Sequence, residues 1–259
     1  MATARSRGLT AIAVTDHDTT HGIAPAQAAA QGTGLEVIAG IEINTDYEGR
    51  EVHLLGYFID HNDATFAELT SSQRRHRLER ARRILDKLDA LGAPVAEDEV
   101  LQTAEGAAVG RPHIARALIA AGHVATVQEA FNRYLKHGAP AYEPRYHLTP
   151  AEAIRAVRRA GGVPVLAHPS KIKRDDLIAD LVRDGLRGLE AWHSDHSPAD
   201  EFRYLRLASD LGLLVTGGTD THGPASGRPI EVGSVAVPEE ILEPLRAEAA
   251  RIAAARPNA

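Results

Sequence analysis

Histidines and carboxylates stand directly after four short apolar runs of this 259-residue sequence. They are Asp16-His17-Asp18, Glu42, His168 and Asp220-Thr221-His222. The sequence has no cysteine, so a bound metal would need His, Asp and Glu ligands, which suit Zn, Mn, Fe or Mg. Clustered divalent ions provide a hydroxide nucleophile and neutralise charge on phosphate oxygens. These residue types therefore predict a metal centre that hydrolyses phosphate esters.

Each of these residues alone has a simpler explanation. His168 precedes a proline and is compatible with an ordinary loop residue, Glu42 with a solvated side chain or a helix cap, and Asp-His-Asp with a turn. Their recurrence after four separate runs favours the metal centre. In the Asp220-Thr221-His222 segment an extended backbone points the Asp and His side chains the same way, so they could bind neighbouring ions.

The elements that would position these residues alternate between strands and helices. We expect strands at Leu9–Val14, Leu35–Ile41, Val52–Ile59, Val163–Ala167, Gly188–Ala191, Leu213–Thr216 and Gly233–Val237. The segment Thr149-Pro150-Ala151-Glu152 is a capping box and predicts a helix to about Ala160, which Gly161-Gly162 ends. This alternation predicts an α/β fold with a mostly parallel sheet or barrel, whose strand ends gather the candidate residues at one rim.

The middle of the sequence is different, because strand patterns stop and helical patterns dominate. The segment SSQRRHRLERARRILDKLDALG is a charged helix pattern, and Arg111–Ala121 and Thr126–Leu135 predict two more helices. We therefore expect a helical insertion at 62–136, between two parts of one α/β domain at 1–61 and 137–259.

Composition limits the partners. The net charge of −6 is spread along the sequence, which argues against stable binding to DNA but not against a small phosphorylated nucleotide or a short RNA end. No apolar run approaches the roughly 20 residues that span a membrane, and no signal peptide pattern is present, so we expect a cytoplasmic location and no membrane partner. Composition does not predict an oligomeric state.

Six motifs in order resemble those of the PHP (polymerase and histidinol phosphatase) superfamily. They are TAIAVTDHDT, AGIEI followed by EVHLLGYFID, GRPHIARAL, VPVLAHP, GLEAWH and GTDTHG, and the resemblance covers the sequence from Leu9 to about Val237. The sequence is most similar to stand-alone phosphoesterases with a helical insertion, a branch that includes 3′,5′-nucleoside bisphosphate phosphatases and a 5′–3′ exoribonuclease. The resemblance implies a distorted (β/α)7 TIM-like barrel with two or three divalent ions, of Mn, Fe, Zn or Mg.

The resemblance also implies roles for individual residues. Glu42 would bridge the first two ions, with Asp220 on the first, His53 and His168 on the second, and His17 and His222 on the third. The segment GLEAWHSDH places Glu190, His193 and His196 near the same rim. One of these histidines could bind metal or protonate the leaving alkoxide, and a polar loop is the alternative. Asp16 is a further catalytic candidate.

One motif of the family is missing. Nothing before Leu9 matches the amino-terminal His-x-His, so we expect the barrel to lack its first strand and the metal centre to lack three ligands. A start codon placed too late or a shortened chain would explain this, and a degenerate relative is the alternative. A missing strand would leave an exposed sheet edge.

Substrate recognition is expected at Gly110-Arg111-Pro112-His113, where helix amides, Arg111 and His113 could hold a phosphate. A plain helix start is the alternative. Further basic candidates for a second phosphate are Lys136, Arg145 and Lys171. The leading hypothesis is a phosphoric ester hydrolase acting on 3′,5′-nucleoside bisphosphates or nucleoside monophosphates. The alternatives are a 5′–3′ exoribonuclease on short RNA and a catalytically impaired PHP module; a histidinol phosphatase fits the helical insertion less well.

Overall fold

The computed structural model describes residues 1–104, 108–144, 146, 148–223 and 231–256, and these form two compact units. One, which we call the sheet unit, comprises Met1–Ala67 and Leu148–Ala259. The other, the helical unit, comprises Glu68–His147. Arg145, one of the basic candidates, lies outside the described residues.

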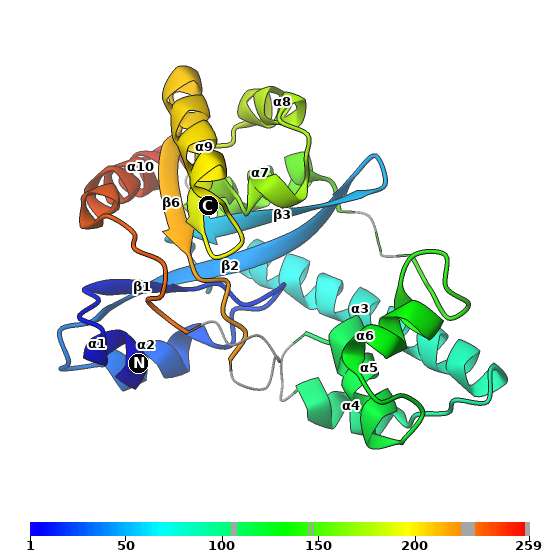
Figure 1. Ribbon diagram of the computed structural model, residues 1–259. Coiled ribbons are helices and arrows are strands. Elements are labelled where there is room, and N and C mark those ends of the chain that lie inside the picture. Colours follow the sequence, from blue (N-terminus) through cyan, green and yellow to red (C-terminus); the bar gives the residue numbers. More distant parts are fainter. Residues whose placement is uncertain (105–107, 145, 147, 224–230, 257–259) are drawn as a thin grey trace. The chain divides into compact units, whose positions relative to one another are not determined.

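The sheet unit contains a curled, six-stranded half-barrel sheet whose strands are ordered as in the sequence (Figure 1). The strands are β1 (Ala11–Val14), β2 (Glu36–Tyr47), β3 (Arg50–Tyr57), β4 (Val163–Leu166), β5 (Gly188–His193) and β6 (Leu214–Gly218). The pairs β1–β2, β4–β5 and β5–β6 are parallel, whereas β3 is antiparallel to both β2 and β4. The sheet is therefore mixed.

A tight turn explains the reversal of β3. Only Glu48 and Gly49 separate β2 from β3, and both have a positive φ, of 51° and 78°. Two central residues of this kind form a hairpin turn that matches the twist of the paired strands. The Gly49 N–H also donates to Oδ1 of Asp46 at 2.8 Å. The amino-terminal half of β3 consequently lies beside the carboxyl-terminal half of β2, with His53 opposite Asn44.

Helices cover the sheet (Figure 1). In the sheet unit these are α1 (Ala2–Ser6), α2 (Ile23–Ala30), α7 (Pro150–Arg159), α8 (Asp176–Asp184), α9 (Pro198–Leu211) and α10 (Leu242–Ala254), with short 3₁₀ turns at η2 (Pro169–Lys171) and η4 (Glu239–Ile241). The capping box of α7 is confirmed, because Thr149 accepts the Glu152 N–H and Glu152 accepts the Thr149 N–H. Buried side chains of α10, including Leu245 and Ile252, pack with strand residues such as Val165.

The expected strand at Gly233–Val237 is wrong. Turns, a bend and irregular backbone occupy this segment. Gly233 has a φ of 79°, a left-handed conformation that does not fit a strand, and a Cβ built on it would lie close to Arg7 and Leu9. The segment packs against the amino-terminal part of the chain without joining the sheet.

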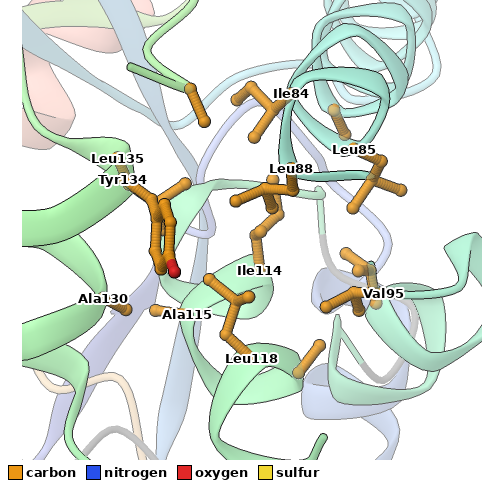
Figure 2. Packing of buried hydrophobic residues seen from close by; sticks show 14 of the residues in the cluster. Ile84, Leu85, Leu88, Val95, Ile114, Ala115, Leu118, Ala130, Tyr134 and Leu135 are labelled. Atoms are coloured by element: carbon orange, nitrogen blue, oxygen red, sulfur yellow. The ribbon is translucent and has the colours of Figure 1, made fainter. Parts of the chain in front are cut away.

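The helical unit has its own core. Its helices are α3 (Ala64–Ala90, which begins in the sheet unit), α4 (Glu97–Ala104), α5 (Arg111–Ala120), α6 (Val127–Ala130) and the π-helix η1 (Phe131–Leu135). Figure 2 shows Leu88, Ile114 and Leu118 packed together in a cluster of buried apolar residues. The sequence did not reveal α4. No helix among the described residues is long and apolar enough to cross a membrane.

Candidate metal centre

Glu42 lies at the centre of the candidate site and is buried. The expectation that it follows its strand is wrong, because β2 continues to Tyr47. It lies instead where the parallel pairing with β1 ends: His17 forms an isolated bridge with Glu42, and the Asp18 N–H donates to the Glu42 carbonyl at 2.9 Å. The carboxylate is thus fixed by backbone pairing on both sides.

Three imidazoles converge on the Glu42 carboxylate. His53 Nδ1 lies 2.7 Å and His168 Nε2 lies 3.1 Å from Oε1, and His17 Nδ1 lies 3.5 Å from Oε2. The residues come from β3, from the segment after β4 and from the segment after β1. Because β3 is antiparallel, its amino-terminal half reaches the rim formed by the carboxyl ends of the other strands.

The protonation of this cluster follows from its charges. Burial alone would raise the pKa of Glu42, but His17 and its other imidazole neighbours hold it well below the usual value. Burial alone would lower the pKa of His53, but hydrogen bonds to Glu42 and Glu51 raise it to about 9. The buried Glu42 carboxylate therefore has positive charge beside it, as a carboxylate ligand of a metal ion does.

The donors present fit a divalent ion. His17, Glu42 and His53 each offer a ligand atom, and these atoms all lie within 4.8 Å of one another. Ligands bound at about 2.0–2.2 Å to one ion must lie close to each other. The donor set of imidazole nitrogen and carboxylate oxygen suits Zn, Mn or Fe. In addition, Nδ1 of buried His168 has no hydrogen-bond partner among the described residues, although its Nε2 faces Glu42.

A second group of candidate ligands consists of His193, Asp195 and Asp220. His193 Nε2 lies 3.5 Å from Asp220 Oδ2, and the Lys171 ammonium lies 3.1 Å from Asp220 Oδ2. Burial alone would raise the pKa of Asp220, but His193 and Lys171 hold it far below the usual value. His222 follows Asp220 and connects the two groups, since its Nε2 lies 3.4 Å from Nε2 of His17.

Two of the three catalytic candidates, His193 and His196, have hydrogen bonds to the backbone, and the third, Asp16, packs against Gly22. The backbone N–H of Asp195 donates to Nδ1 of the buried His193 at 3.0 Å. His196 must donate from Nδ1, because its partner at 2.8 Å is the Ala191 carbonyl, and burial lowers the pKa of His196. Burial raises the pKa of Asp16, whose carboxylate packs so closely on Gly22 that any side chain there would collide with it.

Supporting residues surround the ligands, and sequence analysis missed several of them. Asn44 donates to Asp18 at 3.0 Å and contacts Nδ1 of His17 at 3.1 Å. Glu51 lies 2.6 Å from Nε2 of His53. The alternation of side chains along a strand could have found both, since Asn44 stands two residues after Glu42 and Glu51 two before His53. Asp195 carried no such signal.

Glu190 has a different role from the other acids. It is buried on β5, and its Oε2 accepts the His168 N–H at 2.8 Å. Burial raises the pKa of Glu190 to about 8, so the side chain is largely neutral at pH 7. It therefore fixes the backbone of His168 without adding a full negative charge.

Left-handed backbone marks the same rim. Asp18, His168 and Asp220 have φ values of 51°, 29° and 50°. Such conformations cost about 1–3 kcal/mol for residues other than glycine, and they cluster at functional sites. Each of these residues stands where the chain turns sharply after a strand of the sheet.

The expected substrate-binding residues are divided between the units. Arg111, His113 and Lys136 belong to the helical unit, and Lys171 to the sheet unit. The Gly110 N–H donates to Nδ1 of His113 at 2.9 Å, so His113 caps helix α5. The Arg111 guanidinium donates to the Leu135 carbonyl at 3.2 Å. Within the sheet unit, Lys171 contacts the candidate ligand Asp220.

Comparison with known proteins shows the family of this chain. The PHP domain matches residues 1–141. The chain is 33% identical to a 5′-3′ exoribonuclease of Escherichia coli, over 82% of this chain and 75% of the relative, and 32% identical to a 3′,5′-nucleoside bisphosphate phosphatase of Chromobacterium violaceum, over 86% and 81%. The chain is also similar to a protein of Bifidobacterium adolescentis that is described as a candidate metal-dependent phosphoesterase. The crystal structure of that protein matches this chain with a TM-score of 0.85 and 35% identity, over 95% of this chain and 88% of that one. The chain belongs to the PHP family of phosphoesterases.

Proposed function

We propose that this chain hydrolyses phosphate monoesters of small nucleotides, with 3′,5′-nucleoside bisphosphates or nucleoside monophosphates as substrates. The observation that carries this proposal is the convergence of three imidazoles on the buried Glu42 carboxylate. The relative named as a bisphosphate phosphatase supports the substrate class. A cytoplasmic location is part of the proposal.

The chain's residues would divide the work. His17, Glu42, His53, His168, Asp220 and His222 would hold two or three divalent ions. When bound, these ions supply an activated water and neutralise charge on the phosphate. Lys171 would contact a phosphate oxygen, and His196 or His193 would donate a proton to the leaving group. Asp16 would be a further catalytic residue. We further propose that the sheet unit belongs to a distorted (β/α)7 barrel spanning 1–61 and 137–259, with residues 62–136 inserted in it.

The test is hydrolysis by the chain loaded separately with Mn, Zn, Fe or Mg. Phosphate release from a 3′,5′-nucleoside bisphosphate should depend on the ion, and Glu42→Gln should lose both bound metal and activity. Asp210→Asn, an exposed acid on α9, is the matched control and should keep both. Less than one bound ion per chain, with no Mn-stimulated hydrolysis, would instead favour an impaired PHP module.

A 5′–3′ exoribonuclease is the second candidate, supported by the relative with that name. Product analysis separates the two activities. A short RNA with a 5′-phosphate should lose only inorganic phosphate if the chain is a phosphatase. Successive release of mononucleotides from the 5′ end would assign the exoribonuclease activity.

We propose Arg111 as a contact for a second phosphate, with His113 and Lys136 as weaker candidates. Arg111→Ala should raise the KM for a 3′,5′-bisphosphate by about 10–100-fold, the loss of a charge-assisted contact, and leave the KM for an aryl phosphate unchanged. Arg133→Ala is the control, because Arg133 pairs with Glu129 on the surface of the same unit. Equal changes for both substrates would contradict the role of Arg111.

A further inference from the structure

The Lys171 ammonium lies between two carboxylates. Its Nζ is 3.1 Å from Oδ2 of Asp195 and 3.1 Å from Oδ2 of Asp220. The three residues come from different segments: Lys171 ends η2, Asp195 follows β5 and Asp220 follows β6. Asp220 is a metal ligand in the proposed function, whereas Asp195 is grouped with it only by the proximity of their ligand atoms.

The backbone holds Asp195 in place. The Asp195 N–H donates to Nδ1 of His193, and the His193 side chain is buried. A nitrogen that accepts this bond carries no proton, so the proton of the neutral ring lies on Nε2, the atom that faces Asp220. In this state Nε2 has no lone pair for an ion. In this state His193 does not complete a metal site with Asp195 and Asp220, and Asp195 contacts the Lys171 ammonium instead.

A divalent ion on Asp220 would change the surroundings of Lys171. The ion would take charge from one of the two carboxylates and would repel the ammonium. Asp195 would then be the acid that holds Lys171 beside the centre. The side chains of Lys171 and Asp195 are 38% and 34% exposed, so their ion pair is weak enough to exchange for a phosphate oxygen.

We propose that Asp195 is a positioning residue that holds the Lys171 ammonium at the edge of the metal centre for capture of the substrate phosphate. This inference rests on the proposed phosphoesterase function. It requires that Asp195 acts through Lys171 and binds no ion itself.

Kinetics of Asp195→Asn, Lys171→Met and the double variant test whether Asp195 acts through Lys171. Asp195→Asn should raise the KM for a nucleotide substrate about tenfold with kcat within about twofold of wild type, as expected for loss of one contact in ground-state binding. The double variant should match Lys171→Met, and Asp195→Glu should restore part of the affinity. Metal content should stay at the wild-type value in all four. Asp210→Asn is again the matched control.

A second readout does not depend on hydrolysis. Acetylation of Lys171 in the metal-loaded chain, followed by mass spectrometry, should be faster in Asp195→Asn, and inorganic phosphate should slow it in the wild type. Loss of metal in Asp195→Asn would make Asp195 a ligand and overturn the proposal, as would additive effects in the double variant or unchanged acetylation. A wild type that binds metal but hydrolyses nothing would contradict the proposed function, while the acetylation result would still decide the role of Asp195.

Discussion

His53 lies between two carboxylates, and a proton on its ring would compete with a bound metal ion. Its Nδ1 faces Glu42 at 2.7 Å and its Nε2 faces Glu51 at 2.6 Å. An ion bound at Nδ1 would displace one proton, whereas Nε2 would keep its proton for Glu51. Metal-binding histidines are commonly oriented by such a second carboxylate. The structure thus gives Glu51 a supporting role for the ligand.

Metal binding should therefore depend on pH. The pKa of His53 in the metal-free chain is raised to about 9, above its usual value of about 6.5, so the proton that competes with the ion is held up to pH 9. The apparent dissociation constant for a divalent ion should fall up to tenfold per pH unit between pH 6.5 and 9 from this residue. Calorimetry in two buffers of different ionisation enthalpy measures the released proton.

The variant His53→Gln should bind the ion more weakly and lose this part of the pH dependence. His137→Gln, an exposed histidine of the helical unit, should behave as the wild type. A dissociation constant that stays the same from pH 6.5 to 9 in the wild type would show that the ion does not compete with a proton on His53.

Most of the candidate ligands can be predicted from the sequence, because their chemistry is visible in their type and spacing. The structure brings together His17, Glu42, His53 and His168. Three of them stood out because imidazoles and acids recurred after apolar runs, whereas His53 was a candidate ligand only through the family resemblance. Asp195 did not stand out, because its role depends on a lysine 24 positions earlier and on its own backbone N–H. Such contacts follow from the fold, and local sequence patterns do not predict them.

At the scale of elements, the hairpin β2–β3 explains what the periodicity missed. Strand patterns give the existence of a strand but not its direction. The direction of β3 is set by the turn at Glu48-Gly49, where both residues have a positive φ. A sequence predicts such a turn most strongly when it contains Asn-Gly or Asp-Gly, and this one has neither at that point. The same hairpin extends β2 beyond Glu42 and brings His53 to the rim.

Gly40 allows β1 and β2 to approach closely. A Cβ built on Gly40 would lie 2.8 Å from Cγ2 of Thr15 and 3.0 Å from the carbonyl oxygens of Val14 and Gly56. Gly40→Ala should lower the free energy of unfolding by about 1–3 kcal/mol, because the surrounding backbone must move. The move would also displace His17, so metal affinity should fall. Urea denaturation and a metal titration measure the two effects.

The control for this variant is Gln27→Ala, an exposed position on α2, the helix that connects β1 to β2 along the sequence. It should change neither the free energy of unfolding nor metal affinity. If the Gly40→Ala variant had the wild-type free energy of unfolding, the end of β1 would move without destabilising the fold. The close approach of β1 and β2 would then have no structural importance.

At the scale of the whole molecule, the two units have separate cores. The buried cluster of the helical unit is made by α3, α4, α5, α6 and η1 together with nearby loop residues. Another cluster, in the sheet unit, joins α10 to the strands. The candidate metal ligands all lie in the sheet unit. Damage to the helical core should therefore leave metal binding intact.

Leu118→Ala tests this separation. Leu118 is fully buried in the helical unit, and its truncation should cost about 2–5 kcal/mol. Hydrogen exchange should show lost protection in α3 to η1, with sheet-unit protection and metal content unchanged. Ile154→Ala, a fully buried residue of α7, should produce the opposite pattern. If Leu118→Ala instead lowered protection equally in both units, the chain would unfold as one cooperative body.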